Sequence, residues 1–212
     1  MKPILFNTEM VRAILDGRKT VTRRVVKPQH LRVLESPYHK EHPEMPDGVL
    51  LDKLCRPPYL SGGILYVRET WAEVETVYGV PYYVYKASDQ NGLHSSRQNF
   101  YRWYPSIHMP KEAARLFLRV TGVRVERLQD ISEEDAISEG IEKRSVPVIN
   151  ASGVLEYRIP GTNSVCISGR GAFSNLWNST IKMDKLPVHG WDANPWVWVI
   201  EFKRCERPKE EG

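Results

Sequence analysis

The sequence of 212 residues has few cysteines and no long apolar segment. Its three cysteines, Cys55, Cys166 and Cys205, are far apart and form no CxxC motif, so they indicate neither a zinc site nor a disulfide framework. Because there is no run of about 18 apolar residues, no membrane span is expected, and the N-terminus lacks the apolar core of a signal peptide. We therefore expect a cytoplasmic protein with no metal ion, no cofactor and no membrane partner.

Positive charge is concentrated near the N-terminus of the chain. The overall composition is ordinary for a globular protein, with 41% hydrophobic and 26% charged residues and a formal net charge of +4. Between Arg12 and Arg32, however, seven lysines and arginines accompany a single acidic residue, Asp16. The densest part is the octapeptide 17–24, GRKTVTRR, which holds four cations. This segment predicts either a contact with an anionic partner such as nucleic acid or a small catalytic unit.

Local signals place the octapeptide directly after a short amphipathic helix. Asn7 or Thr8 can cap this helix, and Gly17 is a natural C-terminal stop. The octapeptide then continues in a loop or an emerging strand, and its Thr-Val-Thr run favours the strand.

The remaining pattern is dominated by predicted strands. They fall at 64–71, 81–87, 114–128 (with a bulge or bend at Gly122) and 197–202, and further helices are expected at 132–140, after a Ser-x-x-Asp capping box, and at 173–181. Few helices and no βαβ alternation predict an α+β fold, a small β-barrel with flanking helices, as one domain over 1–205. Long insertions are expected near 28–61, 76–100 and 142–170, the last of them a hairpin, and a disordered tail at 206–212.

One motif resembles a known family of domains. Gly17-x-Lys19-x-x-Thr22-x-Arg24 resembles the signature of ASCH domains, which are PUA-like β-barrels related to RNA-binding modules. That signature usually has Glu where this chain has Thr22, and a threonine there is similar to the small bacterial N4-acetylcytidine amidohydrolases. Four further phrases, LYVRETWAEVE, PSIHMP, LQDISEEDAISEGI and GWDANPWVWVIEF, look like longer ASCH-domain proteins of phages and prophages. The resemblance covers most of the chain and implies a PUA-like (ASCH) barrel.

The resemblance to the amidohydrolases also implies a catalytic interpretation of the octapeptide. Lys19 would activate the Thr22 hydroxyl, because a free hydroxyl is a poor nucleophile at neutral pH. A lysine can do so only where burial or neighbouring cations, here Arg18, Arg23 and Arg24, lower its pKa. The alternative is a basic loop that binds phosphate or a nucleobase without chemistry.

Glu139 lies at the predicted C-terminal end of its helix, where the resemblance places the catalytic glutamate of the amidohydrolases. The negative end of the helix dipole disfavours a charged carboxylate there, which suits a group that moves protons. The alternative is an ordinary exposed acid in a helix that also contains Glu133, Glu134 and Asp135.

Five further residues are candidate ligand contacts. Arg68 and Glu69 are neighbours on a predicted strand, so at most one of them faces a pocket, and the alternative is a surface pair. Trp71 and Trp103 are candidates for stacking on a base, with a place in the core as the alternative. His108 lies between two prolines, where a single histidine is usually structural.

Three functions from different classes are consistent with these residues. The first is a binding module that holds RNA or a modified nucleoside or nucleotide in a basic barrel cleft, with salt-dependent phosphate contacts. The second is an amidohydrolase that removes the acyl group of N4-acylated cytidine through Lys19, Thr22 and Glu139, or, as a variant, a ribonuclease. The third is a phage-encoded protein that binds a host factor.

Overall fold

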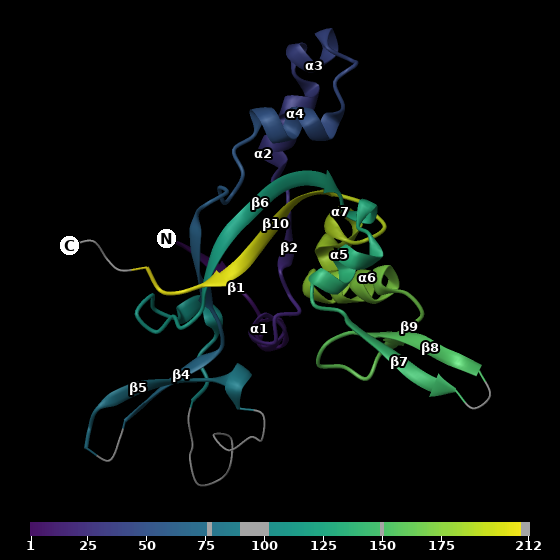
Figure 1. Cartoon of the computed structure of the whole chain (residues 1–212). Coiled ribbons are helices and arrows are strands. Elements are labelled where there is room, and N and C mark those ends of the chain that lie inside the picture. Colours follow the sequence, from purple (N-terminus) through teal and green to yellow (C-terminus); the bar gives the residue numbers. More distant parts are fainter. Residues whose placement is uncertain (76–77, 90–101, 149–150, 209–212) are drawn as a thin grey trace.

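A five-stranded sheet forms the centre of the protein in a computed structural model, which describes residues 1–75, 78–89, 102–148 and 151–208 (Figure 1). The strands lie in the order β1 (Lys2–Leu5), β3 (Ile64–Arg68), β6 (Phe117–Arg127), β10 (Trp196–Cys205) and β2 (Val21–Val25). β1 runs parallel to β3, and every other neighbouring pair is antiparallel. With the helices around it, this sheet makes the fold α+β, as the sequence predicted.

The two longest strands, β6 and β10, bend together at a β-bulge. In their register Glu201 faces Gly122 while Phe202 faces Val120, so Thr121 is the extra residue. A bulge of this kind bends the strand and increases its twist, and Figure 1 shows both strands arching side by side. The predicted bulge or bend at Gly122 is confirmed.

The two edge strands of the sheet approach each other, but backbone pairing among the described residues stops at β1 and β2. The Arg24 guanidinium on β2 spans this gap, because its Nη2 donates to the Leu5 carbonyl oxygen at 3.2 Å. The Phe6 ring has Lys19 Nζ at 5.7 Å and the Arg24 guanidinium at 5.5 Å from its centroid. The predicted barrel is therefore not closed by a strand ladder, since β1 ends at Leu5 and the chain turns into α1 (Thr8–Leu15).

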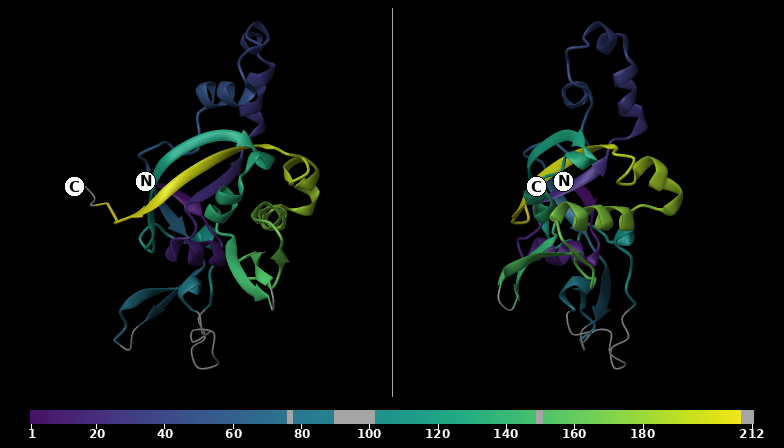
Figure 2. Two further views of the ribbon diagram at one scale, coloured as in Figure 1. Left: turned by 45° about the vertical axis from the view of Figure 1, so that its right-hand side comes forward. Right: turned by 90° about the vertical axis from the view of Figure 1, so that its right-hand side faces the viewer.

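Alternate residues of β10 pack into two different hydrophobic clusters, because both faces of the sheet are buried. Trp198 packs with α1 and α4 (Asp47–Leu54). Val199, on the other face, packs with α5 (Glu133–Ser138) and α6 (Gly169–Thr180), which lie side by side (Figures 1 and 2). The second half of the octapeptide forms the start of β2, where Val21 belongs to the same cluster as Val199.

The predicted insertion at 28–61 is largely helical. It contains α2 (Pro28–Leu31), α3 (Pro37–Glu41) and α4, and it stands at one end of the central sheet (Figures 1 and 2). Proline at the first position of α2 and of α3 has the φ angle that a helix start requires. Leu50 and Leu51 of α4 are fully buried, and α4 lies against β6, so the segment is attached to the core.

One predicted strand is wrong, because residues 64–71 belong to two different sheets. β3 stays in the central sheet, whereas β4 (Trp71–Glu75) pairs with β5 (Pro81–Tyr85) in a separate hairpin. The break falls at Glu69, whose backbone N–H donates to Met109 Sδ at 3.2 Å. Leu65, Val67 and Trp71 keep the alternating spacing of one strand across this break, with Glu69 at the position between them, and periodicity therefore does not reveal the break.

The predicted hairpin within 142–170 and the predicted helices at 132–140 and 173–181 are confirmed. The hairpin consists of β7 (Glu142–Val148) and β8 (Ala151–Arg158), and β9 (Val165–Cys166) pairs with β8 to complete a three-stranded sheet. The short helix α7 (Leu186–His189) precedes β10. The predicted tail at 206–212 and the predicted insertion at 76–100 lie partly outside the described residues. In the described part of the tail, residues 206–208 form neither helix nor strand. Among the described helices, none is both long and apolar enough to cross a membrane.

Candidate functional site

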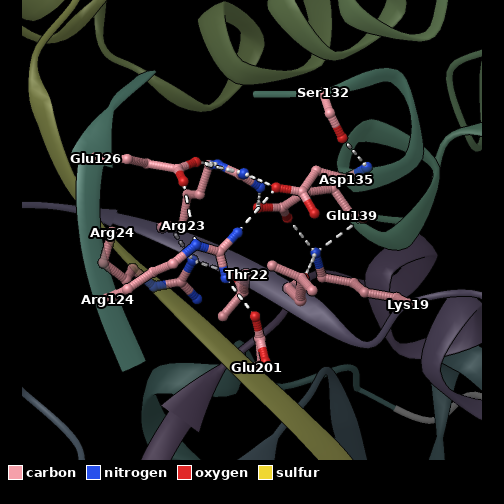
Figure 3. Close-up of polar contacts among 11 residues, drawn as sticks. Lys19, Thr22, Arg23, Arg24, Arg124, Glu126, Ser132, Asp135, Glu139 and Glu201 are labelled. Carbon is pink, nitrogen blue, oxygen red and sulfur yellow. Dashed lines mark hydrogen bonds and ion pairs between the residues drawn. The ribbon is translucent and has the colours of Figure 1, made fainter. Parts of the chain in front are cut away.

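Lys19 and Glu139 form a buried ion pair between the ends of α1 and α5 (Figure 3). Gly17, with a φ of +75°, reverses the chain after α1 and leads it to Lys19. Lys19 Nζ donates to Glu139 Oε2 at 2.6 Å, to the Glu139 carbonyl oxygen at 2.8 Å and to the Val21 carbonyl oxygen at 2.8 Å. The two side chains are 0% and 5% exposed. All three ammonium hydrogens are thus used within the protein.

Gly140 allows this close approach of the two helix ends. It follows Glu139, the C-cap of α5, with a φ of +108°, which residues with a Cβ rarely adopt. A Cβ at this position would lie 3.2 Å from the Ala13 Cβ and 3.6 Å from the Lys19 Cβ. The missing side chain therefore lets the end of α5 pack on α1, and this packing brings Glu139 to the lysine.

Arg23 binds the second oxygen of Glu139 and two further carboxylates (Figure 3). Its Nη1 lies 3.2 Å from Glu139 Oε1, and its Nη2 lies 2.6 Å from Glu126 Oε1 and 2.8 Å from Asp135 Oδ2. Burial lowers the pKa of Arg23, but the carboxylates of Glu139 and Glu126 outweigh it and raise the pKa above its ordinary value. Each Glu139 oxygen therefore faces a cation, which offsets the negative end of the α5 dipole.

The environment of Lys19 lowers its pKa, as a lysine that acts as a base requires. Burial lowers the pKa of Lys19 below its ordinary value. The adjacent Glu139 carboxylate acts in the opposite direction without cancelling the effect of burial, and the charges of Arg24 and Arg23 lower the pKa further. The lowered pKa that the catalytic interpretation requires is thus present, although its first cause is burial rather than the neighbouring arginines.

Lys19 should make the protein more stable as the pH rises in the alkaline range. The pKa of Lys19 is lower in the folded protein than its ordinary value of 10.5, so the unfolded chain binds more protons between these two values, and the free energy of unfolding rises with pH there. Lys19→Met should remove this rise, which is at most about 1.4 kcal/mol per pH unit, in urea unfolding between about pH 7 and 10. Lys185→Met, which replaces an exposed lysine, should keep the wild-type slope. A wild-type slope in Lys19→Met would contradict the lowered pKa.

Thr22 lies beside the ion pair, but its hydroxyl is held by Arg24. Thr22 Oγ1 accepts a hydrogen bond from Arg24 Nη1 at 2.8 Å, and the residue is 1% exposed. The hydrogen bonds of the described residues include none between Lys19 and Thr22, because Lys19 is occupied by Glu139 and the neighbouring carbonyl oxygens. The structure thus brings together Lys19 with Glu139 and Thr22 with Arg24, but not Lys19 with Thr22.

A cavity of about 590 Å³ opens beside Thr22, and we call it the central cavity. Its lining combines four residues of the predicted site, Thr22, Arg23, Arg24 and Glu139, with the aromatic side chains of Tyr59, Phe173 and Trp177. The volume lies within the range of about 300–1,000 Å³ that is typical of small-molecule sites. A lining that combines charged groups with aromatic rings can bind a flat ligand with a polar edge.

Arg18 does not line the central cavity. Its Nη1 donates to the Gly140 carbonyl oxygen at 3.1 Å, and its Nη2 lies 3.0 Å from Asp16 Oδ2 and 3.7 Å from Glu142 Oε1. Arg18 therefore supports the turn between α5 and β7 instead of contacting a ligand in the cavity.

Arg68 and Glu69 belong to a separate polar cluster that does not line the central cavity. Glu69 is 1% exposed, and its two carboxylate oxygens accept from Arg115 Nε and Nη2, each at 2.9 Å. Arg68 Nη2 donates to the Ile107 carbonyl oxygen. The surface-pair alternative is therefore wrong for Glu69, whose charge is neutralised inside the protein.

The predicted stacking residues also lie away from the central cavity. Trp71 is buried in a cluster with Met109 and other apolar side chains, and Trp103 packs on the β4–β5 hairpin. His108 is exposed. For Trp71, the alternative of a place in the core is confirmed.

Sequence reasoning missed the acidic and aromatic partners of the octapeptide. Asp135 was expected only as part of a capping box, and Ser132 Oγ does accept from its backbone N–H at 3.0 Å. Its carboxylate, however, binds Arg23 and Arg124. The available signal was the charge imbalance, because buried cations need nearby carboxylates from elsewhere in the chain.

Within the ranges that the structure describes, no group of three or more His, Cys, Asp or Glu side chains is placed to hold a metal ion. Comparison with known protein families, curated proteins and solved structures gives no match for this chain. The geometry of the central cavity and its ion pairs is therefore the basis of the functional assignment.

Proposed function

We propose that the protein binds a nucleoside, either free or as an unpaired base of RNA, in the central cavity. The supporting observation is that this cavity combines the polar groups of Thr22, Arg24 and Glu139 with the aromatic rings of Tyr59 and Trp177. Recognition of a base needs both polar groups and aromatic rings, because its edge is recognised by hydrogen bonds and its faces pack on aromatic or apolar side chains.

The same residues support a PUA-like, ASCH-type fold for the chain. Each position of the motif has a role at this site: Gly17 ends α1, Lys19 binds Glu139, and Thr22 and Arg24 line the central cavity. The curved sheet, with its edge strands joined by the Arg24 side chain, is compatible with an open form of such a barrel. The ligand that the resemblance implies, RNA or a modified nucleoside, agrees with the chemistry of the cavity.

Nucleoside binding can be tested by calorimetric titration with the four common ribonucleosides and N4-acetylcytidine. Arg24→Gln removes the guanidinium that faces the ligand and should weaken binding by about tenfold or more, because a charge-assisted hydrogen bond is lost. The control is Arg144→Gln, since Arg144 is exposed on β7 and lies outside the central cavity. Failure of all five nucleosides to bind the wild type, or equal affinity in both variants, would contradict the proposal; circular dichroism checks that Arg24→Gln is folded.

A hydrolase acting on N4-acetylcytidine is the second candidate. It is favoured because Thr22 lines the central cavity together with Glu139, a carboxylate that is paired with a lysine. Lys19 would have to give a proton to Glu139 and exchange one of its present hydrogen bonds for one to Thr22 before it could accept a proton. Binding requires no such rearrangement, and for that reason it is the first proposal.

A further inference from the structure

A second cavity of about 330 Å³ adjoins the central cavity. The two cavities share Arg24, Val25 and Tyr59. The rest of the second cavity is lined by Lys27, His30, Arg56, Pro58 and Trp198, and we call it the cationic cleft. The segment 28–61 supplies both His30 and Arg56, so the insertion builds one wall of the cleft.

Among the described residues, no carboxylate forms an ion pair with the lysine and the two arginines that line the cationic cleft. No acidic residue lines it. The described contacts of the Lys27 and Arg56 side chains include no hydrogen bond or ion pair, and those of Arg24 are to neutral oxygen atoms. By contrast, carboxylate partners are present for Arg12, Arg18, Arg23, Arg115 and Arg124. Unpaired cations in a concave site create the potential that attracts an anion.

A third cavity, of about 260 Å³, also adjoins the central cavity, with which it shares Asn7, Met10 and Glu139 among other residues. It is lined by Glu9 and by no lysine or arginine, and the cations near it are already paired: Arg12 with Glu9, and Lys19 with Glu139. A ligand that extends out of the central cavity therefore meets cations without a carboxylate partner in the cationic cleft and not in the third cavity.

We infer that the ligand carries a phosphate, which the cationic cleft binds while the base occupies the central cavity. This inference rests on the proposed nucleoside binding and makes it more specific. A phosphate bears one or two negative charges and several acceptor oxygens. These match Lys27 and Arg56, which have no described hydrogen bond or ion pair, and Arg24, whose described hydrogen bonds are all to neutral oxygen atoms. Arg24 lies where the cavities meet and can contact both parts of the ligand. The ligand class is thus a nucleotide, as a free monophosphate or within an RNA strand.

The test compares matched ligands on the full-length protein. The four common ribonucleosides and their 5′-monophosphates are titrated into the wild type, into Lys27→Ala/Arg56→Ala, and into the control Lys40→Ala/Lys53→Ala. The control removes two exposed lysines of the same segment that do not line the cleft. We expect the wild type to bind the best monophosphate about tenfold or more tightly than its nucleoside, with a gain that falls as salt rises.

The two pairs of substitutions should separate phosphate binding from base binding. Lys27→Ala/Arg56→Ala should lose the phosphate gain and bind the nucleoside as the wild type does, whereas the control should retain the gain. A single-stranded oligoribonucleotide of the same base then identifies the source: tighter binding than the monophosphate supports a strand, and weaker binding supports a free nucleotide. All four residues are exposed, so both variants should fold.

Equal affinity of the wild type for nucleoside and monophosphate would overturn the inference and leave nucleoside binding intact. An equal loss of the phosphate gain in Lys27→Ala/Arg56→Ala and in the control would have the same consequence. If no nucleoside binds, the proposed function fails, and inorganic pyrophosphate tests the cleft alone. Pyrophosphate binding that is lost in Lys27→Ala/Arg56→Ala would still support an anion site there, whereas no binding of pyrophosphate would overturn that as well.

Discussion

Replacing Glu139 by alanine should lower the free energy of unfolding by about 3–5 kcal/mol. The change leaves Lys19, whose side chain is fully buried, without its carboxylate and removes one of the three acidic partners of Arg23. The loss is large because the remaining lysine charge stays in a place where water cannot solvate it. Urea unfolding at neutral pH, followed by circular dichroism, measures it.

Two further substitutions separate the lost charge from the lost side chain. Glu134→Ala removes an exposed carboxylate from the same helix and should change stability by less than about 1 kcal/mol. Glu139→Gln keeps an amide oxygen for Lys19 and should give an intermediate loss. The penalty of Glu139→Ala should also shrink at alkaline pH, because burial lowers the pKa of Lys19 and the lysine can then lose its proton. A loss no larger than that of Glu134→Ala would rule out the buried ion pair.

The position of Glu139 could be predicted because local signals mark both ends of its helix. Ser132 caps the first turn, and Gly140 adopts the positive φ that ends the helix. These signals act within a few residues of one another, so spacing in the sequence is enough to locate them. The same reasoning holds for α1 and its stop at Gly17, which fixes where the chain leaves the helix, two residues before Lys19.

Contacts between distant parts of the chain could not be predicted in this way. Lys19 was expected on Thr22, three residues away, but it binds Glu139, which is 120 residues away. Glu69 and Arg115 form another ion pair between distant parts of the chain, since 46 residues separate them. Periodicity and capping describe local backbone, whereas these pairs depend on how α5 packs on α1 and where the chain changes sheets.

If the protein is the hydrolase proposed as the second candidate, turnover of N4-acetylcytidine in the central cavity should depend on Thr22 far more strongly than nucleoside binding does. Thr22 lines this cavity, and Thr22→Val keeps the size of its side chain but removes the oxygen that accepts from Arg24. We expect turnover to fall by about 10³-fold or more, as on removal of a nucleophile, while the affinity for cytidine changes by less than about tenfold. Chromatographic assay of released cytidine and calorimetric titration measure the two quantities.

The sequence of bond changes explains this dependence on the hydroxyl. In the proposed reaction, attack by Thr22 Oγ1 on the acetyl carbon would form an ester, the bond between carbon and N4 would break, the amine would take a proton, and water would then release acetate from threonine. Lys19 would take the Thr22 proton as a neutral amine, after giving a proton to Glu139 and exchanging its hydrogen bond to the Val21 carbonyl oxygen for one to Thr22; Glu139 would then pass the proton it received to the leaving amine. An acetylated wild-type protein in mass spectrometry, absent from Thr22→Val, would support this order. Wild-type turnover in Thr22→Val would instead assign the attack to water activated by Glu139, which lines the same cavity.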